Sequence, residues 1–301
     1  MLHGGLERGP GPARARGGNV AVACSSFPAR GASCWRSSVG RSCCWACSAA
    51  RWPSWSRCRA NRTAVRWAEL PGHGALAGEL VVVGAHYDSV ETDAGCPGAN
   101  DNATGTAAML ALAHRLRGRT LPRTVRFVGF VNEEPPYFWT DDMGSVRAAK
   151  LSRARGERIA AMLSLETLGS YSDLPGSQRY PFPFSLFYPT TADFVAFVGN
   201  VSSRAITRQA VGAFRRHARF PSEGAAPASV VGGVGLSDHW SYWQQDYPAV
   251  MVTDTAFFRY PWYHTPRDVP AAIDHERLAR VVDGLTRVVE ELAGGERGEG
   301  R

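Results

Sequence analysis

The sequence predicts a single α/β domain, in which a central mixed, mostly parallel β-sheet is flanked by helices on both faces. Two observations predict this fold. From about Arg66 onward, short apolar segments alternate with helix-like segments, which is the pattern of an α/β domain. Most of the apolar segments are also nearly continuous, as expected for strands that are buried on both faces. A chain of 301 residues with 44% hydrophobic content can bury a core of this kind.

The individual elements are expected from the order of these segments. Strands are predicted where apolar residues run together, at residues 79–86, 124–132, 162–166, 184–188 and 248–254. Helices are predicted at residues 103–117, 143–154, 192–216 with an interruption, 239–245 and 275–293. The last helix carries an apolar stripe at helical spacing, formed by Leu278, Val281, Val282, Leu285, Val288, Val289 and Leu292. Segments 172–183 and 221–235 are rich in glycine and proline and are expected to be loops. The domain is expected to span residues 61–295, and residues 296–301 to form a disordered tail.

Residues 1–60 differ from the rest of the chain in composition. They contain nine arginines, a single acid (Glu7) and six of the seven cysteines, without helical or strand periodicity and without the compact apolar segment of a signal peptide. Three explanations remain open: a wrong translation start or shifted reading frame, a disordered or targeting segment, or a small unit held by disulfides or a metal. We therefore expect this segment to be unstructured or mistranslated.

The charge of the chain argues against nucleic acid as a partner. Residues 1–60 have a net charge of +8, so residues 61–301 sum to −1 within the total of +7, whereas a nucleic-acid-binding domain needs a basic face. No stretch reaches the roughly 18 apolar residues that span a bilayer, so no transmembrane segment is expected.

Polar side chains that can bind a metal occur at the carboxyl ends of the predicted strands, where open α/β sheets place their sites. His86 ends the first strand, and Asp88 points to the same side two residues later. That spacing suits an imidazole that binds a metal through one nitrogen while a carboxylate holds the other. Asp101 lies in a turn before a helix, where its carboxylate can bridge two metals or simply cap the helix.

Three further candidates follow later strands. Glu133 and Glu134 are adjacent, and two such carboxylates repel each other unless a cation lies between them or their roles differ. One of them can bind a metal while the other takes a proton from metal-bound water; a solvated loop is the alternative interpretation. Glu166 ends a third strand, where an unpaired carboxylate would be costly to bury. His264 follows an aromatic loop and is either a ligand or an ordinary structural group.

Together the candidates supply two imidazoles and three carboxylates, a set of ligands that suits zinc, with cobalt or manganese as substitutes. A carboxylate shared between two metals would place them roughly 3.5–4 Å apart, as in two-metal aminopeptidases. Asp238 and His239 can contact substrate, although a role for Asp238 in capping the following helix is the simpler interpretation. Aromatic residues near the strand ends either line an apolar substrate pocket or pack in the core: Tyr137, Phe138, Trp139, Phe257, Phe258 and Tyr263.

The order of the short motifs along the chain resembles that of the M28 family of zinc peptidases, typified by bacterial leucyl aminopeptidases. The motifs are HYD at 86–88, NDNATG at 100–105, NEE at 132–134, LE at 165–166, SDH at 237–239 and YHTPRD at 263–268. The resemblance runs from about Val65 to the last predicted helix and covers none of residues 1–60. It implies the zinc-dependent exopeptidase fold and two bound zinc ions. The family also has an N-terminal helix and first strand that this chain does not clearly supply.

The resemblance also implies a role for each candidate residue. His86 and Glu166 would hold one zinc ion, Glu134 and His264 the other, and Asp101 would bridge them. Asp88 would orient His86, and Glu133 would be the general base. One departure concerns Glu166, because well-known two-zinc members have aspartate at this position.

The implied activity is the release of N-terminal residues from a peptide or small aminoacyl substrate. Two alternatives share the fold: a glutaminyl cyclase-like acyltransferase with a single zinc ion, and a non-catalytic binding domain. The resemblance favours secretion or a location in the cell envelope, whereas the lack of a clear signal peptide is compatible with the cytoplasm.

Overall fold

The computed structural model of the chain describes residues 66–180 and 182–294. The predictions made for residues 1–60 and for the tail at 296–301 lie outside the described residues. Within the described ranges, no helix is long and apolar enough to cross a membrane.

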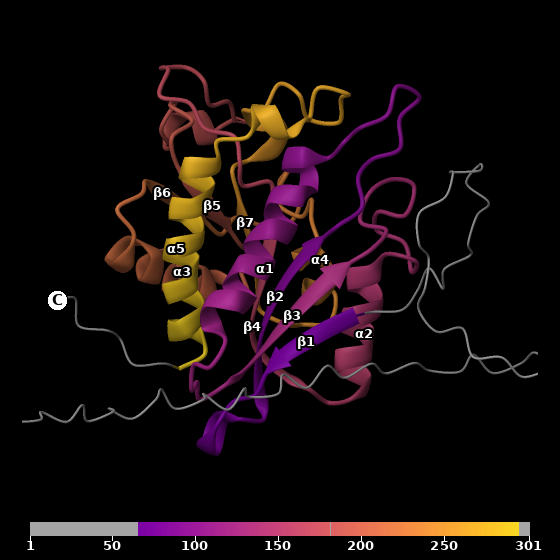
Figure 1. Cartoon of the computed structure of the whole chain (residues 1–301), viewed down its shortest axis with the longest axis vertical. Coiled ribbons are helices and arrows are strands. Elements are labelled where there is room, and N and C mark those ends of the chain that lie inside the picture. Colours follow the sequence, from indigo (N-terminus) through magenta and orange to yellow (C-terminus); the bar gives the residue numbers. More distant parts are fainter. Residues whose placement is uncertain (1–65, 181, 295–301) are drawn as a thin grey trace, which may run out of the picture.

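A seven-stranded sheet forms the centre of the described part of the chain (Figure 1). Its strands are β1 (Arg66–Leu70), β2 (Glu79–His86), β3 (Thr124–Phe130), β4 (Arg158–Glu166), β5 (Val195–Val198), β6 (Ser222–Ala225) and β7 (Ala249–Thr253). They are arranged in the order β1-β3-β2-β4-β7-β5-β6. Strands β3, β2, β4 and β7 are parallel, whereas β1 pairs antiparallel with β3 and β5 antiparallel with β7. The predicted mixed, mostly parallel sheet is therefore confirmed.

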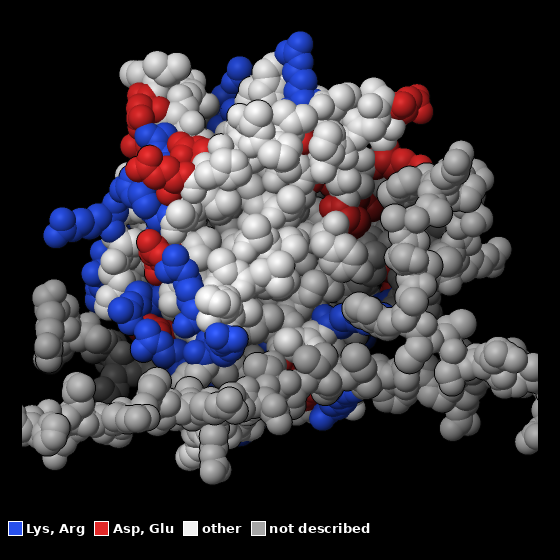
Figure 2. Space-filling view, in the orientation of Figure 1, with Lys and Arg blue, Asp and Glu red and all other residues white. Residues whose placement is uncertain are grey.

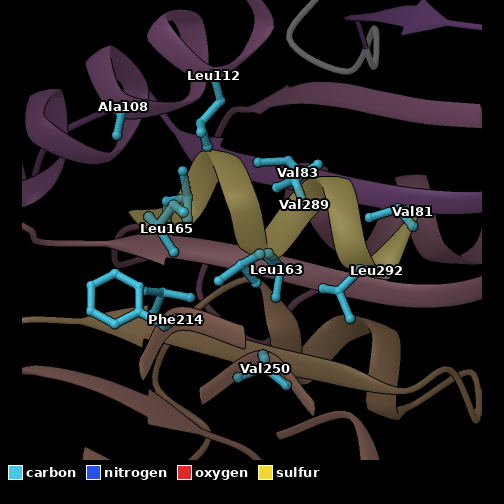
Figure 3. Packing of buried hydrophobic residues seen from close by; sticks show 14 of the residues in the cluster. Val81, Val83, Ala108, Leu112, Leu163, Leu165, Phe214, Val250, Val289 and Leu292 are labelled. Atoms are coloured by element: carbon cyan, nitrogen blue, oxygen red, sulfur yellow. The ribbon is translucent and has the colours of Figure 1, made fainter. Parts of the chain in front are cut away.

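Helices cover both faces of this sheet. They are α1 (Gly105–Leu116), α2 (Gly144–Ala154), α3 (Arg204–His217), α4 (His239–Trp243) and α5 (His275–Leu292). Alternate residues of β2 enter two separate clusters: Val81 and Val83 pack with α1, α3 and α5, whereas Leu80 and Val82 pack with α2 and α4. Figure 3 shows labelled side chains of α1, α3 and α5 packed against those of β2, β4 and β7. Burial on both faces explains why the central strands are continuously apolar.

Charged side chains on the face that α1 and α5 cover lie mainly at one margin, where basic and acidic residues alternate (Figure 2). Among the ion pairs of α1 and α5, Arg115 pairs with Asp283, and Arg119 and Arg287 both pair with Glu290. These arginines are therefore partly neutralised within the fold.

Gly284 lies where α5 packs closely on α3. A Cβ atom at this position would lie 2.3 Å from Cε2 of Phe214 and 2.7 Å from Cβ of Ala218. Because the Phe214 ring is fully buried, it has little room to move. We expect Gly284→Ala to lower the free energy of unfolding, measured by urea titration, by roughly 1–3 kcal/mol, as for overpacked cores.

The matched control for this prediction is Gly212→Ala in α3. Its Cβ atom would contact only the Arg216 side chain, at 3.4 Å, so the helix preference of alanine should leave stability equal or higher. An unchanged free energy of unfolding in Gly284→Ala would show that α3 and α5 can separate without penalty.

Two predicted elements are wrong. Residues 184–188 form no strand but a 3-10 turn at Phe184–Leu186, with Leu186 and Phe187 exposed by 68% and 77%. The segment lies between Pro183 and Pro189, and proline cannot donate to a strand ladder. Residues 192–216 are not one interrupted helix, because the first part is strand β5 and only the second part is α3.

Strands β1 and β6 were not predicted. Both lie at the edges of the sheet, and β6 is only four residues long, has the sequence SEGA and falls in a segment expected to be a loop. Edge strands of this kind carry a weak apolar signal, because only one side is paired.

Candidate metal centre

Three neighbouring parallel strands bring most of the candidate residues to one edge of the sheet. His86 ends β2, which lies between β3 and β4. Glu133 and Glu134 follow β3, and Glu166 ends β4. Since the three strands are parallel, their carboxyl ends meet, as in other open α/β sheets. Asp101 and His264 enter from loops, and the six side chains form three overlapping groups of possible metal ligands. Two of these groups share Asp101 and are described first; the third joins His86 with Glu133 and Glu134.

The first group surrounds the imidazole of His86. Its Nε2 atom lies 3.2 Å from Oε2 of Glu166 and 3.3 Å from Oδ1 of Asp101. His86 is completely buried, and the two carboxylates are 5% and 2% exposed. Well-known two-zinc members have the shorter aspartate at this position. The carboxylate of Glu166 nevertheless reaches the cluster.

The second group surrounds the imidazole of His264. Its Nε2 atom lies 3.0 Å from Oδ2 of Asp101 and 3.3 Å from Oε2 of Glu134. The ring of Tyr263 stacks on that of His264, with 3.8 Å between the ring centroids. Asp101 thus belongs to both groups, with one oxygen facing each imidazole.

Glu133 and Asp88 lie next to these groups. The Oε2 atom of Glu133 is 3.7 Å from Nε2 of His86, farther away than the oxygens of Glu166 and Asp101. The Nδ1 atom of His86 contacts the main-chain oxygen of Asp88 at 3.1 Å, whereas the Asp88 carboxylate is 3.6 Å away. That carboxylate also accepts a hydrogen bond from the main-chain N–H of Glu134. Asp88 therefore holds His86 mainly through its backbone, and links it to Glu134.

Burial and crowded charge shift the pKa values of the cluster. Burial raises the pKa of Glu166 to about 7; burial and neighbouring carboxylates also raise the pKa of Glu133 well above its ordinary value. Asp101 behaves differently, because burial is outweighed by the nearby imidazoles of His264 and His86, which lower its pKa to about 2. For His264, burial is outweighed by hydrogen bonds with Asp101 and Glu134, and its pKa rises to about 9. The raised pKa values of Glu133 and Glu166 thus reflect the cost of burying four carboxylates together with two imidazoles.

The donor set fits a divalent metal. Among the described residues, buried atoms without a hydrogen-bond partner include Nε2 of His86, Oδ1 of Asp101 and Oε1 of Glu134. Buried polar atoms are rarely left unpaired, and three of them in one cluster of imidazoles and carboxylates match the nitrogen and oxygen ligands of zinc. A divalent cation would also favour the ionised form of the buried carboxylates.

Several residues that hold Asp101 in place were not singled out from the sequence. The Asp268 carboxylate accepts hydrogen bonds from the main-chain N–H groups of Asn100 and Asp101. The side-chain oxygen of Asn102 accepts the N–H groups of Gly105 and Thr167. Asp268 closes the YHTPRD motif, so its place in that motif was the available signal.

Ser237 is a second omission. Its hydroxyl donates a hydrogen bond of 2.8 Å to Oε2 of Glu166, and it is also 2.9 Å from the Ser164 hydroxyl. It does not cap the following helix, because no side-chain cap is present at α4. Its contact instead fixes the orientation of the Glu166 carboxylate.

The proposed substrate contacts are placed differently from one another. Asp238 and His239 are completely buried; the His239 ring contacts the main-chain oxygen of Val234 and packs edge-on against Trp243. In contrast, Phe257 and Tyr263 line a cavity beside Glu166, together with Phe258. Tyr137, Phe138 and Trp139 are not among the residues that line this cavity.

Comparisons of sequence agree with this arrangement. Residues 67–289 match peptidase family M28. The chain is 40% identical over 221 residues to the uncharacterized protein YfbL of Escherichia coli, covering 71% of this chain and 67% of YfbL. It is 28% identical over 222 residues to aminopeptidase YwaD of Bacillus subtilis, covering 71% of this chain and 41% of YwaD.

Comparisons of structure give the fold. BSAP, a zinc aminopeptidase from Bacillus subtilis, superposes with a TM-score of 0.57 at 23% identity, covering 75% of this chain and 49% of BSAP. A glutaminyl cyclase from an Acidobacteriales bacterium superposes with a TM-score of 0.56 at 17% identity, covering 76% of this chain and 73% of the cyclase. The chain thus spans less than half the length of YwaD and about half that of BSAP.

The two kinds of comparison establish different things. Structural likeness at these identities shows an α/β fold that peptidases and cyclases share. The family match extends from Trp67 in β1 to Val289 in α5. It includes every residue of the metal cluster, that is His86, Asp101, Glu133, Glu134, Glu166 and His264. The chain therefore belongs to peptidase family M28.

Proposed function

We propose that this domain is a two-zinc aminopeptidase, which releases N-terminal residues from peptides or hydrolyses small aminoacyl amides. The position of Asp101 carries the proposal. Its carboxylate lies between two imidazoles, 3.3 Å from Nε2 of His86 and 3.0 Å from Nε2 of His264, as expected for a ligand shared by two metals. The name of YwaD, an aminopeptidase, and that of BSAP, a zinc aminopeptidase, give further support.

Each side chain of the cluster would have its own role. His86 and Glu166 would hold one metal, Glu134 and His264 the other, and Asp101 would bridge them. Zinc, or cobalt or manganese in its place, would supply a Lewis acid that polarises the scissile carbonyl and favours the ionisation of water. The Ser237 hydroxyl keeps the Glu166 carboxylate oriented, and the backbone of Asp88 keeps His86 oriented.

Glu133 is the proposed general base. Its carboxylate stands 3.7 Å from Nε2 of His86, farther than the carboxylates of Glu166 and Asp101, which leaves it free to face the attacking water. A raised pKa makes it a better proton acceptor. The Glu133 carboxylate would accept a proton from the water and then donate it to the nitrogen of the leaving amine.

The number of metals bound per chain tests the two-metal centre. We expect dialysis against a chelator to abolish hydrolysis of leucine p-nitroanilide, because the carbonyl would no longer be polarised. Titration with zinc should restore the rate and saturate at two ions per chain, counted by elemental analysis.

Other outcomes would favour the alternatives that share the fold. If zinc binding saturates at one ion per chain and the protein cyclises an N-terminal glutamine, the domain is a cyclase and not a peptidase. Two bound zinc ions without turnover of any aminoacyl amide would point to a non-catalytic binding domain.

A further inference from the structure

The cavity beside the metal cluster extends along the sheet to its edge strand. One residue from each of four adjacent strands lies in a single row of its wall: Glu166 of β4, Thr253 of β7, Ala196 of β5 and Glu223 of β6. The register pairs Glu166 with Thr253, Thr253 with Ala196, and Ala196 with Glu223. Since neighbouring strands are about 4.8 Å apart, Glu223 lies roughly 14 Å along the sheet from Glu166.

Glu223 places a negative charge at the far end of this row. Among the described residues that line the cavity, Glu166 and Glu223 are the acids, and no lysine or arginine is present. Glu166 faces the metal cluster through contacts with His86 and Ser237. The charge of Glu223 is therefore the one available to a group that enters the cavity.

The nearest cation among the described residues does not form a close ion pair with Glu223. The guanidinium of Arg215 is 3.5 Å from Oε2 of Glu223, but it donates its shorter hydrogen bonds to the main-chain oxygen and hydroxyl of Ser222. Arg215 is also about half exposed, whereas the Glu223 side chain is 29% exposed. Burial raises the pKa of Glu223, as expected for a carboxylate that lacks a full partner.

Aromatic rings form part of the cavity wall on the side of Glu223. Tyr180, Phe184 and Tyr188 line the cavity, and the ring centroids of Tyr180 and Phe184 each lie about 6 Å from that of Tyr188. The hydroxyl of Tyr188 donates to the main-chain oxygen of Gly224, beside Glu223. Rings of this kind accept an aliphatic stem and attract a cation over their faces.

We propose that the cavity binds a basic side chain, lysine or arginine, of the N-terminal residue of the substrate, with its terminal nitrogen at Glu223. This assignment rests on the proposed function, because it places the reacting end of that residue at the metal cluster. A neutral side chain that fills the cavity would cover the Glu223 carboxylate without giving it a hydrogen-bond donor, which is unfavourable.

Binding of two amino alcohols tests this assignment without any scissile bond. Lysinol and norleucinol have the same four-carbon stem and differ only in the terminal ammonium group. Calorimetry with the zinc-loaded protein should show lysinol binding roughly 10- to 100-fold more tightly, the value of a hydrogen bond to a charged group. Glu223→Gln should abolish this preference.

Asp193→Asn is the matched control. Asp193 contributes to the field at Glu223 but is not among the residues that line the cavity, so its replacement should leave the preference within about twofold. Equal binding of the two amino alcohols by the unchanged protein would overturn the proposal, as would a preference that survives Glu223→Gln.

Hydrolysis of lysine p-nitroanilide by the same preparations separates the two proposals. If the protein prefers lysinol through Glu223 but hydrolyses no aminoacyl amide, the cavity assignment is supported and the aminopeptidase proposal is wrong. If it hydrolyses aminoacyl amides without preferring lysinol, the aminopeptidase proposal is supported and the cavity assignment is wrong.

Discussion

Replacement of Glu133 by glutamine is expected to lower kcat for an aminoacyl p-nitroanilide by about 100- to 10,000-fold, the range for loss of a general base. Glutamine keeps the size of the side chain but cannot take up a proton at neutral pH. Because the Glu133 carboxylate stands 3.7 Å from Nε2 of His86, farther than either carboxylate of the first group, zinc should remain at two ions per chain. Steady-state kinetics and elemental analysis of one preparation measure both quantities.

Glu276→Gln provides the control for this variant. It makes the same chemical change at an exposed position in the first turn of α5, so kcat should stay within about twofold, as for a surface substitution. Normal kcat in Glu133→Gln would exclude Glu133 as the base. A low kcat accompanied by the loss of one zinc ion would instead make Glu133 a ligand.

Replacement of Asp101 by asparagine is expected to have the other large effect, on metal content as well as on rate. The Asp101 carboxylate faces both imidazoles, so removal of its charge weakens both metal sites at once. We expect fewer than one zinc ion per chain after gel filtration, and a loss of kcat of at least about 100-fold, because electrostatic stabilisation at the carbonyl is lost as well. Elemental analysis and kinetics with added zinc measure these changes.

The fold should tolerate this substitution. Asp268 holds the main chain at Asn100 and Asp101, so the loop is not held by the Asp101 side chain alone. Asp93→Asn is the control, since Asp93 lies exposed in the preceding loop and should leave zinc content at two. Two tightly bound zinc ions in Asp101→Asn would contradict a bridging role.

Elements with a long or sharply bounded apolar pattern were predicted well from the sequence. Strand β2 has the predicted limits, and α5 ends one residue earlier than expected. In both cases burial decides the pattern, because the strand is covered on two faces and the helix on one. The short apolar segments 162–166 and 248–254 were predicted correctly as strands, whereas residues 184–188 and strand β5 were not, although these two have similar composition. Pairing with β7 on one side and β6 on the other makes β5 a strand.

For the metal cluster, the sequence by itself determined the types of ligand and their places at the strand ends, because parallel strands bring those ends to one edge. The residue pairs and distances came from the tertiary structure. So did the contacts of Asp268 with the Asp101 loop, of Ser237 with Glu166, and the place of Glu223 in the cavity. Each of these joins residues that are far apart in the chain. Local spacing carries no information on such contacts, because they depend on how distant segments pack. The order β4-β7-β5-β6 within one sheet, for example, places Glu223 in the same cavity wall as Glu166.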